Sequence, residues 1–473
     1  MDNKGVVKRR RMLVPPDGGW GYLICIAVII IYITSSMFMN FFGQVFDEFI
    51  KKVSMSSRNI NLMNSLSIMS AAIAGFLTSP MLKMMSKRMV AFIGAVLFNL
   101  GVSVTIFINS EVYFIIFEGV VQSAGVGILY NIAFTMINEY FVVKRFLMIS
   151  IVQSVTAIAI MLSPYLISWS LDHFGYRGTL VLISGITLET LVAVALLQPV
   201  QWHMKEVEVG DEEEIKLLME AEKMAGKSNQ PTSVKPSEID TNNEKSDLEL
   251  QEKPTGIWCR IKLFFNISEL RSFLVSNALL GTTLTMFSDL TFTLMLPQAL
   301  KAMDWDDARV SNALFLSGLG DMVARVSCIF LNKWLTRMGC QEVYIIGMFV
   351  GFVARLGMLW NDNPIAVMMF ITVIGSCRCL IMILPPLIIA EVVPPELFSS
   401  AIGMSMLATG VVSLVLGPAI GAIQDLTGSY PTAFYILASF FLIVVIFWTI
   451  ELCYKRNLHK RRTTDLDQCN KPK

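Results

Sequence analysis

The chain has 473 residues, of which 54% are hydrophobic and only 16% are charged. Soluble domains carry about 25% charged residues, so this composition excludes an ordinary soluble enzyme and indicates an integral membrane protein. The 38 Lys and Arg nearly balance the 37 Asp and Glu. This balance is an average, because residues 205–253 hold 14 acidic and 7 basic side chains and leave the remainder basic.

In chain order, six apolar stretches precede this acidic segment. A spanning helix needs about 20 mainly apolar residues. The six candidates are Gly21–Phe46, Asn59–Leu82, Met89–Ser110, Gly119–Asn138, Phe146–Leu171 and Gly178–Leu197. The first is longer than the apolar region of a signal peptide and lacks a small-residue cleavage site, so we expect it to be retained as a span.

Six more candidates follow: Ser272–Leu300, Val310–Trp334, Val343–Trp360, Pro364–Ala390, Leu397–Gln424 and Leu426–Ile450. The sequence thus predicts an all-α membrane protein with twelve transmembrane helices in two six-helix bundles. The intervening segment is too rich in Glu, Lys, Ser and Asn to bury a core, so we expect a disordered cytoplasmic linker. The predicted parts are a tail over 1–18, a bundle over 19–200, the linker over 201–268, a bundle over 269–454 and a tail over 455–473.

Basic residues of the short connections predict the orientation, because Lys and Arg concentrate on the cytoplasmic side. They precede the first span, follow the last, and lie between spans two and three, four and five, and eight and nine. Both termini should therefore be cytoplasmic. Anionic lipid at these borders accounts for the basic clusters, so we expect membrane lipid and no nucleic acid as a partner.

Charged side chains inside the predicted spans are candidates for function, since each costs roughly 2.5–3.5 kcal/mol to insert. They are Glu118, Asp289, Asp321, Arg325, Arg355 and Arg378. Asp321 and Arg325 are four residues apart, hence on one helix face, where they form either a permanent ion pair or a pair that a solute or a proton opens. Asp289 and Arg378 either pair across helices or contact solute.

The other polar candidates carry weaker signals. Arg355 and Glu118 are expected nearer the outer surface, where long side chains reach water. Asn40, Tyr130 and Asn131 offer hydrogen-bonding groups within spans, either to a solute or between helices. Eight dispersed cysteines read as free thiols and three dispersed histidines form no cluster, so we predict neither a metal site nor a cofactor.

The segment Pro16-Asp17-Gly18-Gly19-Trp20-Gly21-Tyr22 resembles the opening signature of the monocarboxylate transporter family within the major facilitator superfamily. The resemblance covers nearly the whole chain outside the linker and tails. It continues through Gly125-x-Gly127, Asn131, Tyr140-Phe141, Lys144-Arg145, Gly320-Asp321-x-x-x-Arg325, Leu384-Pro385-Pro386-Leu387 and Gly417-Pro418-x-x-Gly421. It implies a structural role for Asp17, Gly18, Gly19, Trp20 and Arg145, carboxylate binding by Arg325 and proton coupling by Asp321. It also implies a plasma-membrane location and suggests a single-span immunoglobulin-like ancillary subunit.

One departure from the family concerns the first span. The proton-linked lactate carriers use a lysine where this sequence has Asn40. Without that cation, lactate should be a poor substrate and transport should depend weakly on the proton gradient. The alternative is that Asn40 bridges two helices and that Arg378 supplies the missing positive charge.

Two functions remain open from the sequence. The first is a carrier that moves a small organic acid or amino-acid-like solute by alternating access. Arg325 would anchor the carboxylate with Asp321 as its counter-ion, and Asn40, Tyr130, Asn131 and Arg378 would contribute further contacts. The second is a transport-inactive membrane sensor or scaffold that acts through the linker.

Overall fold

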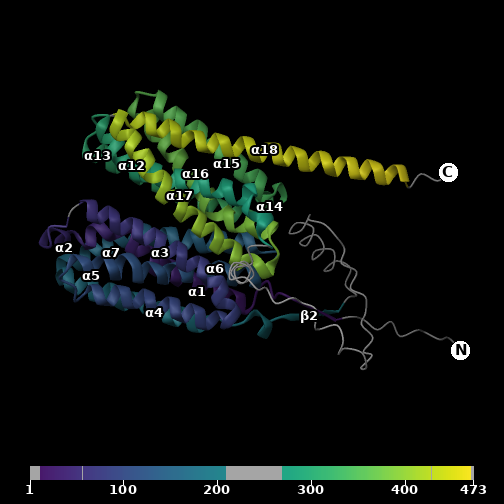
Figure 1. Ribbon diagram of the computed structural model, residues 1–473, viewed down its shortest axis with the longest axis horizontal. Coiled ribbons are helices and arrows are strands. Elements are labelled where there is room, and N and C mark those ends of the chain that lie inside the picture. The colour runs from purple at the N-terminus through teal and green to yellow at the C-terminus, as the bar shows by residue number, and fades with distance from the viewer. Residues whose placement is uncertain (1–10, 56, 209–268, 428, 470–473) are drawn as a thin grey trace, which may run out of the picture.

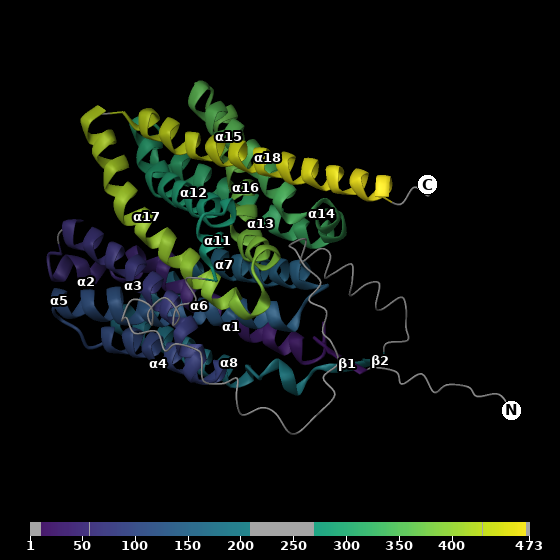
Figure 2. The same cartoon turned by 45° about the vertical axis from the view of Figure 1, so that its right-hand side comes forward.

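The computed structural model describes residues 11–55, 57–208, 269–427 and 429–469, and every structural statement below concerns these residues. The chain folds into two helical bundles that lie side by side (Figures 1 and 2). One bundle holds the helices before residue 200 and the other holds the helices after residue 270.

The N-terminal bundle follows the predicted apolar stretches closely. Its elements are α1 (Trp20–Val45), α2 (Asp47–Lys52), α3 (Ser57–Met84), α4 (Lys87–Thr105), α5 (Glu111–Phe114), the π-helix η1 (Ile115–Gln122), α6 (Ser123–Tyr140), α7 (Arg145–Thr187) and α8 (Glu189–Leu196). The α7 helix is 43 residues long and bends at Gly175, where φ is 63° and ψ is −175°. Only glycine adopts this backbone conformation readily, and the bend divides α7 into two limbs. The first limb matches the predicted span Phe146–Leu171, and the second limb together with α8 matches the predicted span Gly178–Leu197.

The C-terminal bundle has the same plan. Its elements are α11 (Arg271–Leu274), α12 (Asn277–Ala302), α13 (Asp307–Phe330), α14 (Asn332–Met338), α15 (Cys340–Trp360), α16 (Pro364–Val392), the 3-10 turn η3 (Pro395–Leu397), α17 (Phe398–Thr427) and α18 (Tyr430–Cys469). Within the described residues, ten helical stretches are long and apolar enough to cross a membrane. One of them, Arg145–Leu196, contains both limbs of α7, and α1 adds the shorter apolar stretch Trp20–Ser36.

Two short strands lie where the sequence predicted a tail and a linker. β1 (Arg11–Val14) pairs antiparallel with β2 (Lys205–Glu208), with Arg11 opposite Glu208 and Val14 opposite Lys205. The 3-10 turn η2 (Val200–Trp202) leads into β2. The first residues of the predicted linker are thus ordered by pairing with the N-terminal tail, and the rest of the linker, 209–268, lies outside the described residues. At the other end, α18 continues to Cys469 through most of the predicted C-terminal tail.

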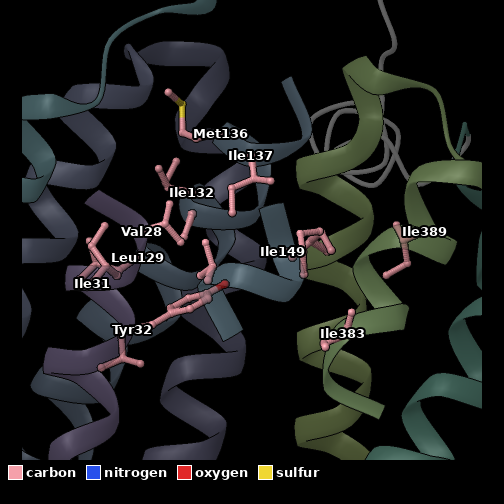
Figure 3. Close-up of a cluster of buried hydrophobic side chains, with 14 of the residues drawn as sticks. Val28, Ile31, Tyr32, Leu129, Ile132, Met136, Ile137, Ile149, Ile383 and Ile389 are labelled. Carbon is pink, nitrogen blue, oxygen red and sulfur yellow. The ribbon is translucent and has the colours of Figure 1, made fainter. Parts of the chain in front are cut away.

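The largest apolar cluster spans both bundles. Figure 3 shows Val28 and Ile31 of α1 against Ile132 of α6, with Ile149 of α7 and Ile383 of α16 beside them. Many large apolar side chains on the outer helix faces are instead exposed. This distribution fits a protein whose outer surface contacts lipid rather than water.

The bundles touch most extensively along two helix pairs, α3 with α17 and α7 with α13, and also where α6 meets α17 and where α7 meets α16 and α14. The Ser79 and Ser400 hydroxyls are hydrogen-bonded across the first pair. Ser79 lies in the last turns of α3 and Ser400 in the first turn of α17. These helix ends lie at the end of the molecule from which β1 and the last turns of α18 project, called the termini end below (Figures 1 and 2). The bundles are therefore closed against each other at the termini end.

Candidate functional site

Asp321 and Arg325 form the ion pair that their spacing predicted. The Arg325 Nε lies 3.0 Å from both carboxylate oxygens of Asp321. The side chains are 8% and 19% exposed, for Arg325 and Asp321 respectively. Because both lie on one turn of α13, the pair forms without any movement between helices.

Arg325 also reaches across to the other bundle. Its Nη1 donates to Oε1 of Gln153 on α7 at 2.9 Å. The guanidinium is thus held by a carboxylate of its own helix and by an amide of the opposite bundle. Any motion that separates α7 from α13 must break the second of these hydrogen bonds.

A second charged cluster surrounds Asp289 of α12. Arg355 of α15 donates from Nη2 to Oδ1 of Asp289 at 2.8 Å, and Arg378 of α16 places Nε 3.5 Å from Oδ2. Arg355 is fully buried, donates to the Gly351 carbonyl oxygen, and lies 3.9 Å above the centroid of the Phe441 ring. The expectation that Arg355 reaches the outer surface is therefore wrong, because Asp289 and the aromatic ring hold it inside the bundle.

Arg378 differs from Arg355 in its surroundings. Its side chain is 32% exposed, and the 3.5 Å separation from Asp289 is that of an ion pair rather than a good hydrogen bond. The predicted pairing of Asp289 with Arg378 across helices is therefore present, but it is loose. The tight partner of Asp289 is Arg355, which the sequence did not indicate.

These two clusters meet at a cavity of about 140 Å³ inside the C-terminal bundle. The cavity is bounded by α12, α13 and α16. Its lining residues are Asp289, Phe292, Thr293, Leu296, Leu314, Ser317, Gly318, Asp321, Ile374, Gly375 and Arg378. Charged, hydroxyl and apolar groups therefore share one small space, as in sites for small polar ligands.

The charges around the cavity do not cancel. The described charged side chains here are Asp289 and Asp321, against Arg325, Arg355 and Arg378. Asp321 neutralises Arg325 and Asp289 neutralises Arg355, which leaves the positive charge of Arg378 at the cavity wall. The site therefore favours a ligand with one negative charge.

The predicted contacts of the N-terminal bundle lie elsewhere. Asn40 is in α1, but its side chain is outside the described part of the chain. The Tyr130 hydroxyl is 3.2 Å from Oγ of Ser36, and its ring packs against Tyr32 with centroids 4.9 Å apart. Neither Tyr130 nor Asn131 lines the 140 Å³ cavity.

Asn131 makes hydrogen bonds between helices. Its Nδ2 donates to the carbonyl oxygens of Gly75 on α3 and Ser399 on α17, at 2.8 and 3.0 Å. Its Oδ1 accepts from the Ser399 hydroxyl at 2.8 Å. The side chain is fully buried, so in this conformation Asn131 joins the two bundles rather than facing a solute.

The opening motif fixes the start of α1 to the connection between α6 and α7. Oδ1 of Asp17 accepts hydrogen bonds from the backbone N–H groups of Val142, Val143 and Lys144, at 2.8 to 3.3 Å. The backbone N–H of Asp17 donates to the Tyr140 carbonyl oxygen. One short side chain therefore organises the turn that leads into α7.

The other motif residues strengthen the same corner. Trp20 donates from Nε1 to the Leu196 carbonyl oxygen at 3.3 Å, and its ring stacks on His203. Gly18 and Gly19 form the turn between Asp17 and Trp20. Arg145 donates to the carbonyl oxygens of Phe141 and Asn138, at 3.0 and 3.1 Å. Trp20 and Arg145 thus donate to backbone carbonyl oxygens at the termini end, and none of these motif residues lines the cavity.

The sequence analysis missed one functional candidate and misplaced another. Gln153 was not singled out, because one glutamine in an apolar helix carries no signal until α13 is placed beside it. Glu118 was expected near the outer surface, yet it is 6% exposed. Position along a span predicts depth, but which way a side chain faces depends on the neighbouring helices.

Two helical bundles, one of which contains a charged cavity, define the class of the protein, a polytopic membrane carrier. The chain belongs to the Major Facilitator Superfamily, whose sequence profile it matches over residues 24–360 and 278–466. It is similar to monocarboxylate transporter 12 of Homo sapiens, with 23% identity over 97% of this chain and 85% of that protein. It is likewise similar to monocarboxylate transporter 1 of Bos taurus, with 23% identity over 97% of this chain and 93% of that protein.

Solved structures confirm the fold. FucP, in a crystal structure described as outward, matches with a TM-score of 0.58 and 16% identity over 91% of this chain and 98% of that one. The proton:xylose symporter XylE matches with a TM-score of 0.61 and 12% identity, over 90% and 94%. At these identities the likeness concerns the arrangement of the helices.

Proposed function

We propose that this protein carries a small organic acid with a single net negative charge across the plasma membrane by alternating access. The observation that supports the proposal is the positive charge of Arg378, which is left over at the wall of a 140 Å³ cavity. The names of the relatives, monocarboxylate transporters 12 and 1, support a carboxylate as the charged group.

The cavity size limits the solute further. An engineered cavity of about 150 Å³ holds one benzene molecule, so a cavity of this size suits about six non-hydrogen atoms. A short monocarboxylate or the smallest amino acids fall within this range. Larger solutes would need the cavity to extend into the space between the bundles.

Arg378 and Arg325 have different roles in this proposal. Arg378 makes the first contact, because it lines the cavity and its hold on Asp289 is loose. Arg325 becomes available when the bundles move and its hydrogen bond to Gln153 breaks, while Asp321 remains its counter-ion and a proton acceptor. Arg378 thereby replaces the positive charge of the lysine that the proton-linked lactate carriers have at the position of Asn40. This supports the alternative in which the substitution at position 40 does not make lactate a poor substrate.

The proposal includes the orientation and the partners that the sequence suggested. Both termini face the cytoplasm, so an antibody against a tag at residue 2 should not label intact cells. A single-span immunoglobulin-like subunit would be found by co-purification from the plasma membrane. Labelling of intact cells would show that the termini face the outside. The proposed role of Arg378 in the cavity would not be affected.

Uptake by proteoliposomes tests the function. Proteoliposomes with the wild-type protein should accumulate at least one radiolabelled short monocarboxylate from a panel. Uptake of the same compound by Arg378→Gln should be at least tenfold lower. Arg309→Gln is the matched control, because Arg309 is 58% exposed on α13, is ion-paired with Asp306 and does not line the cavity. Absence of uptake across the panel would favour the sensor or scaffold. Equal losses in both variants would remove Arg378 from the site.

A further inference from the structure

Glu118 is an acidic residue buried inside the N-terminal bundle. It lies in the π-helix η1, between α5 and α6, and is 6% exposed. Gly101 of α4 allows a close approach here, because a Cβ at that position would lie 2.5 Å from Cβ of Gln122. π-helical turns are rare and often occur at functional sites.

Glu118 differs from the other buried acids in its partners. Asp321 is bonded to Arg325, and Asp289 is paired with two arginines. Among the described residues, no Lys, Arg or His is hydrogen-bonded or ion-paired to the Glu118 carboxyl. A carboxylate without a cation is strongly disfavoured in a low-dielectric interior, whereas a protonated carboxyl carries no charge there.

The charged groups on the surrounding helices do not change this account. Lys83 of α3 and Lys87 and Arg88 of α4 lie at the termini end, and Lys87 pairs with Glu139 of α6. Glu111 of α5 is hydrogen-bonded to Asn59. The side chain of Arg58, in the first turn of α3, is outside the described residues.

The neighbour that contacts the Glu118 carboxyl is neutral. With its NH₂ group toward Glu118, the Gln122 side chain donates to both carboxyl oxygens, to Oε1 at 3.3 Å. Turned the other way, its carbonyl oxygen accepts a hydrogen bond from a protonated carboxyl. The Gln122 amide can therefore form a hydrogen bond with the Glu118 carboxyl in both its protonated and its ionised form.

The segment next to Glu118 packs toward the end opposite the termini. The ring of Tyr176, in the second limb of α7, packs against Phe46 and Phe49, and both of these rings pack against Phe114, the residue directly before η1. The Tyr176 hydroxyl is buried and has no hydrogen-bond partner among the described residues. The same tyrosine lines a cavity of about 160 Å³ together with Glu48, Lys52 and Arg177. Helix α2, which carries Glu48 and Lys52, lies at that opposite end (Figure 1).

We propose that Glu118 is a proton-binding site, separate from Asp321, which exchanges its proton with the opposite end of the molecule past Tyr176. The inference goes beyond the proposed function. It rests on buried groups of the N-terminal bundle, whereas the solute cavity lies in the C-terminal bundle.

Infrared difference spectroscopy on the purified full-length protein in lipid nanodiscs tests the site without any solute. A protonated carboxylic acid has a carbonyl-stretching band that a carboxylate lacks. Wild-type protein at pH 7 should show such a band, and ¹³C-labelled glutamate should shift it while ¹³C-labelled aspartate should not. Glu118→Gln should remove the band and Asp321→Asn should leave it.

A second variant keeps the test decisive if Glu118→Gln does not fold. Gln122→Leu retains the carboxyl and removes its hydrogen-bonding amide, so the band should remain and change frequency. A band that responds to neither Glu118→Gln nor Gln122→Leu would overturn the proposal, as would its absence from wild-type protein. These results hold whether or not the proteoliposomes take up a monocarboxylate, so the two proposals can fail separately.

Discussion

At the residue scale, the Asp321–Arg325 pair raises the question of whether it supports the fold or the transport cycle. The geometry is compatible with both, since the pair is mostly buried and also contacts Gln153 of the opposite bundle. Removal of one member of a buried pair leaves an uncompensated charge, which costs about 3–5 kcal/mol. Removal of both charges avoids that penalty, so stability and transport can be separated.

We therefore expect Arg325→Ala to lower both the melting temperature and the uptake. The double variant Asp321→Asn with Arg325→Gln should recover most of the melting temperature, because no buried charge is left alone, yet it should still not transport. Fluorescence-detected thermal unfolding and proteoliposome uptake measure the two effects. Normal uptake by the double variant would show that the pair serves only the fold.

At the element scale, the contact between α3 and α17 holds the termini end closed. Gly403 of α17 lies against α3 so closely that an added Cβ would be 2.7 Å from the Gly75 carbonyl oxygen and 2.9 Å from Cα of Phe76. Both neighbours are backbone atoms and cannot move aside independently. A side chain at this position must therefore separate the two bundles.

Gly403→Val should favour conformations that are open at the termini end. Double electron–electron resonance between one spin label on α3 and one on α17, both near that end, should give a longer label-to-label distance in Gly403→Val than in the wild type. Gly421→Val is the control on the same helix, because an added Cβ there meets nothing within 4 Å. An unchanged distance distribution in Gly403→Val would mean that this contact does not determine the closure.

The bend of α7 is the second feature at this scale. Gly175 adopts φ 63° and ψ −175°, where any other residue is strained by about 1–3 kcal/mol. Gly175→Ala should therefore lower the melting temperature. Gly185→Ala, in a helical part of the second limb with open space around it, should be neutral or raise it, since alanine favours helix by about 1 kcal/mol. Equal melting temperatures would show that the bend tolerates a side chain.

At the scale of the whole molecule, the sequence predicted the architecture because the bilayer imposes it. Apolar stretches of spanning length identify most helices without any knowledge of their packing. The spacing of Asp321 and Arg325 predicted their contact for the same reason, since both lie on one helix. The opening motif was also found from sequence, but its hydrogen bonds to the backbone at 142–144 required the folded chain.

The contacts between helices were not predictable in this way. Arg355 and Asp289 are 66 positions apart, and Arg325 and Gln153 are 172 apart. Which arginine pairs with which acid depends on the rotation of each helix, and apolar stretches without a polar face do not specify it. As a result, Arg378 could be identified as the arginine that is available to a solute only after the structure had shown which acids pair with Arg325 and Arg355.

The most direct test of the central claim, that the cavity selects a single negative charge, is uptake of size-matched solutes that differ in charge. Proteoliposomes with the full-length protein would be offered lactate as monoanion, lactamide as neutral analogue, alanine as zwitterion and malonate as dianion. The cavity around Arg378 predicts that lactate is accumulated at least tenfold more than lactamide and malonate, and that Arg378→Gln abolishes this preference. Uptake of lactamide equal to that of lactate, or an unchanged preference in Arg378→Gln, would contradict the claim.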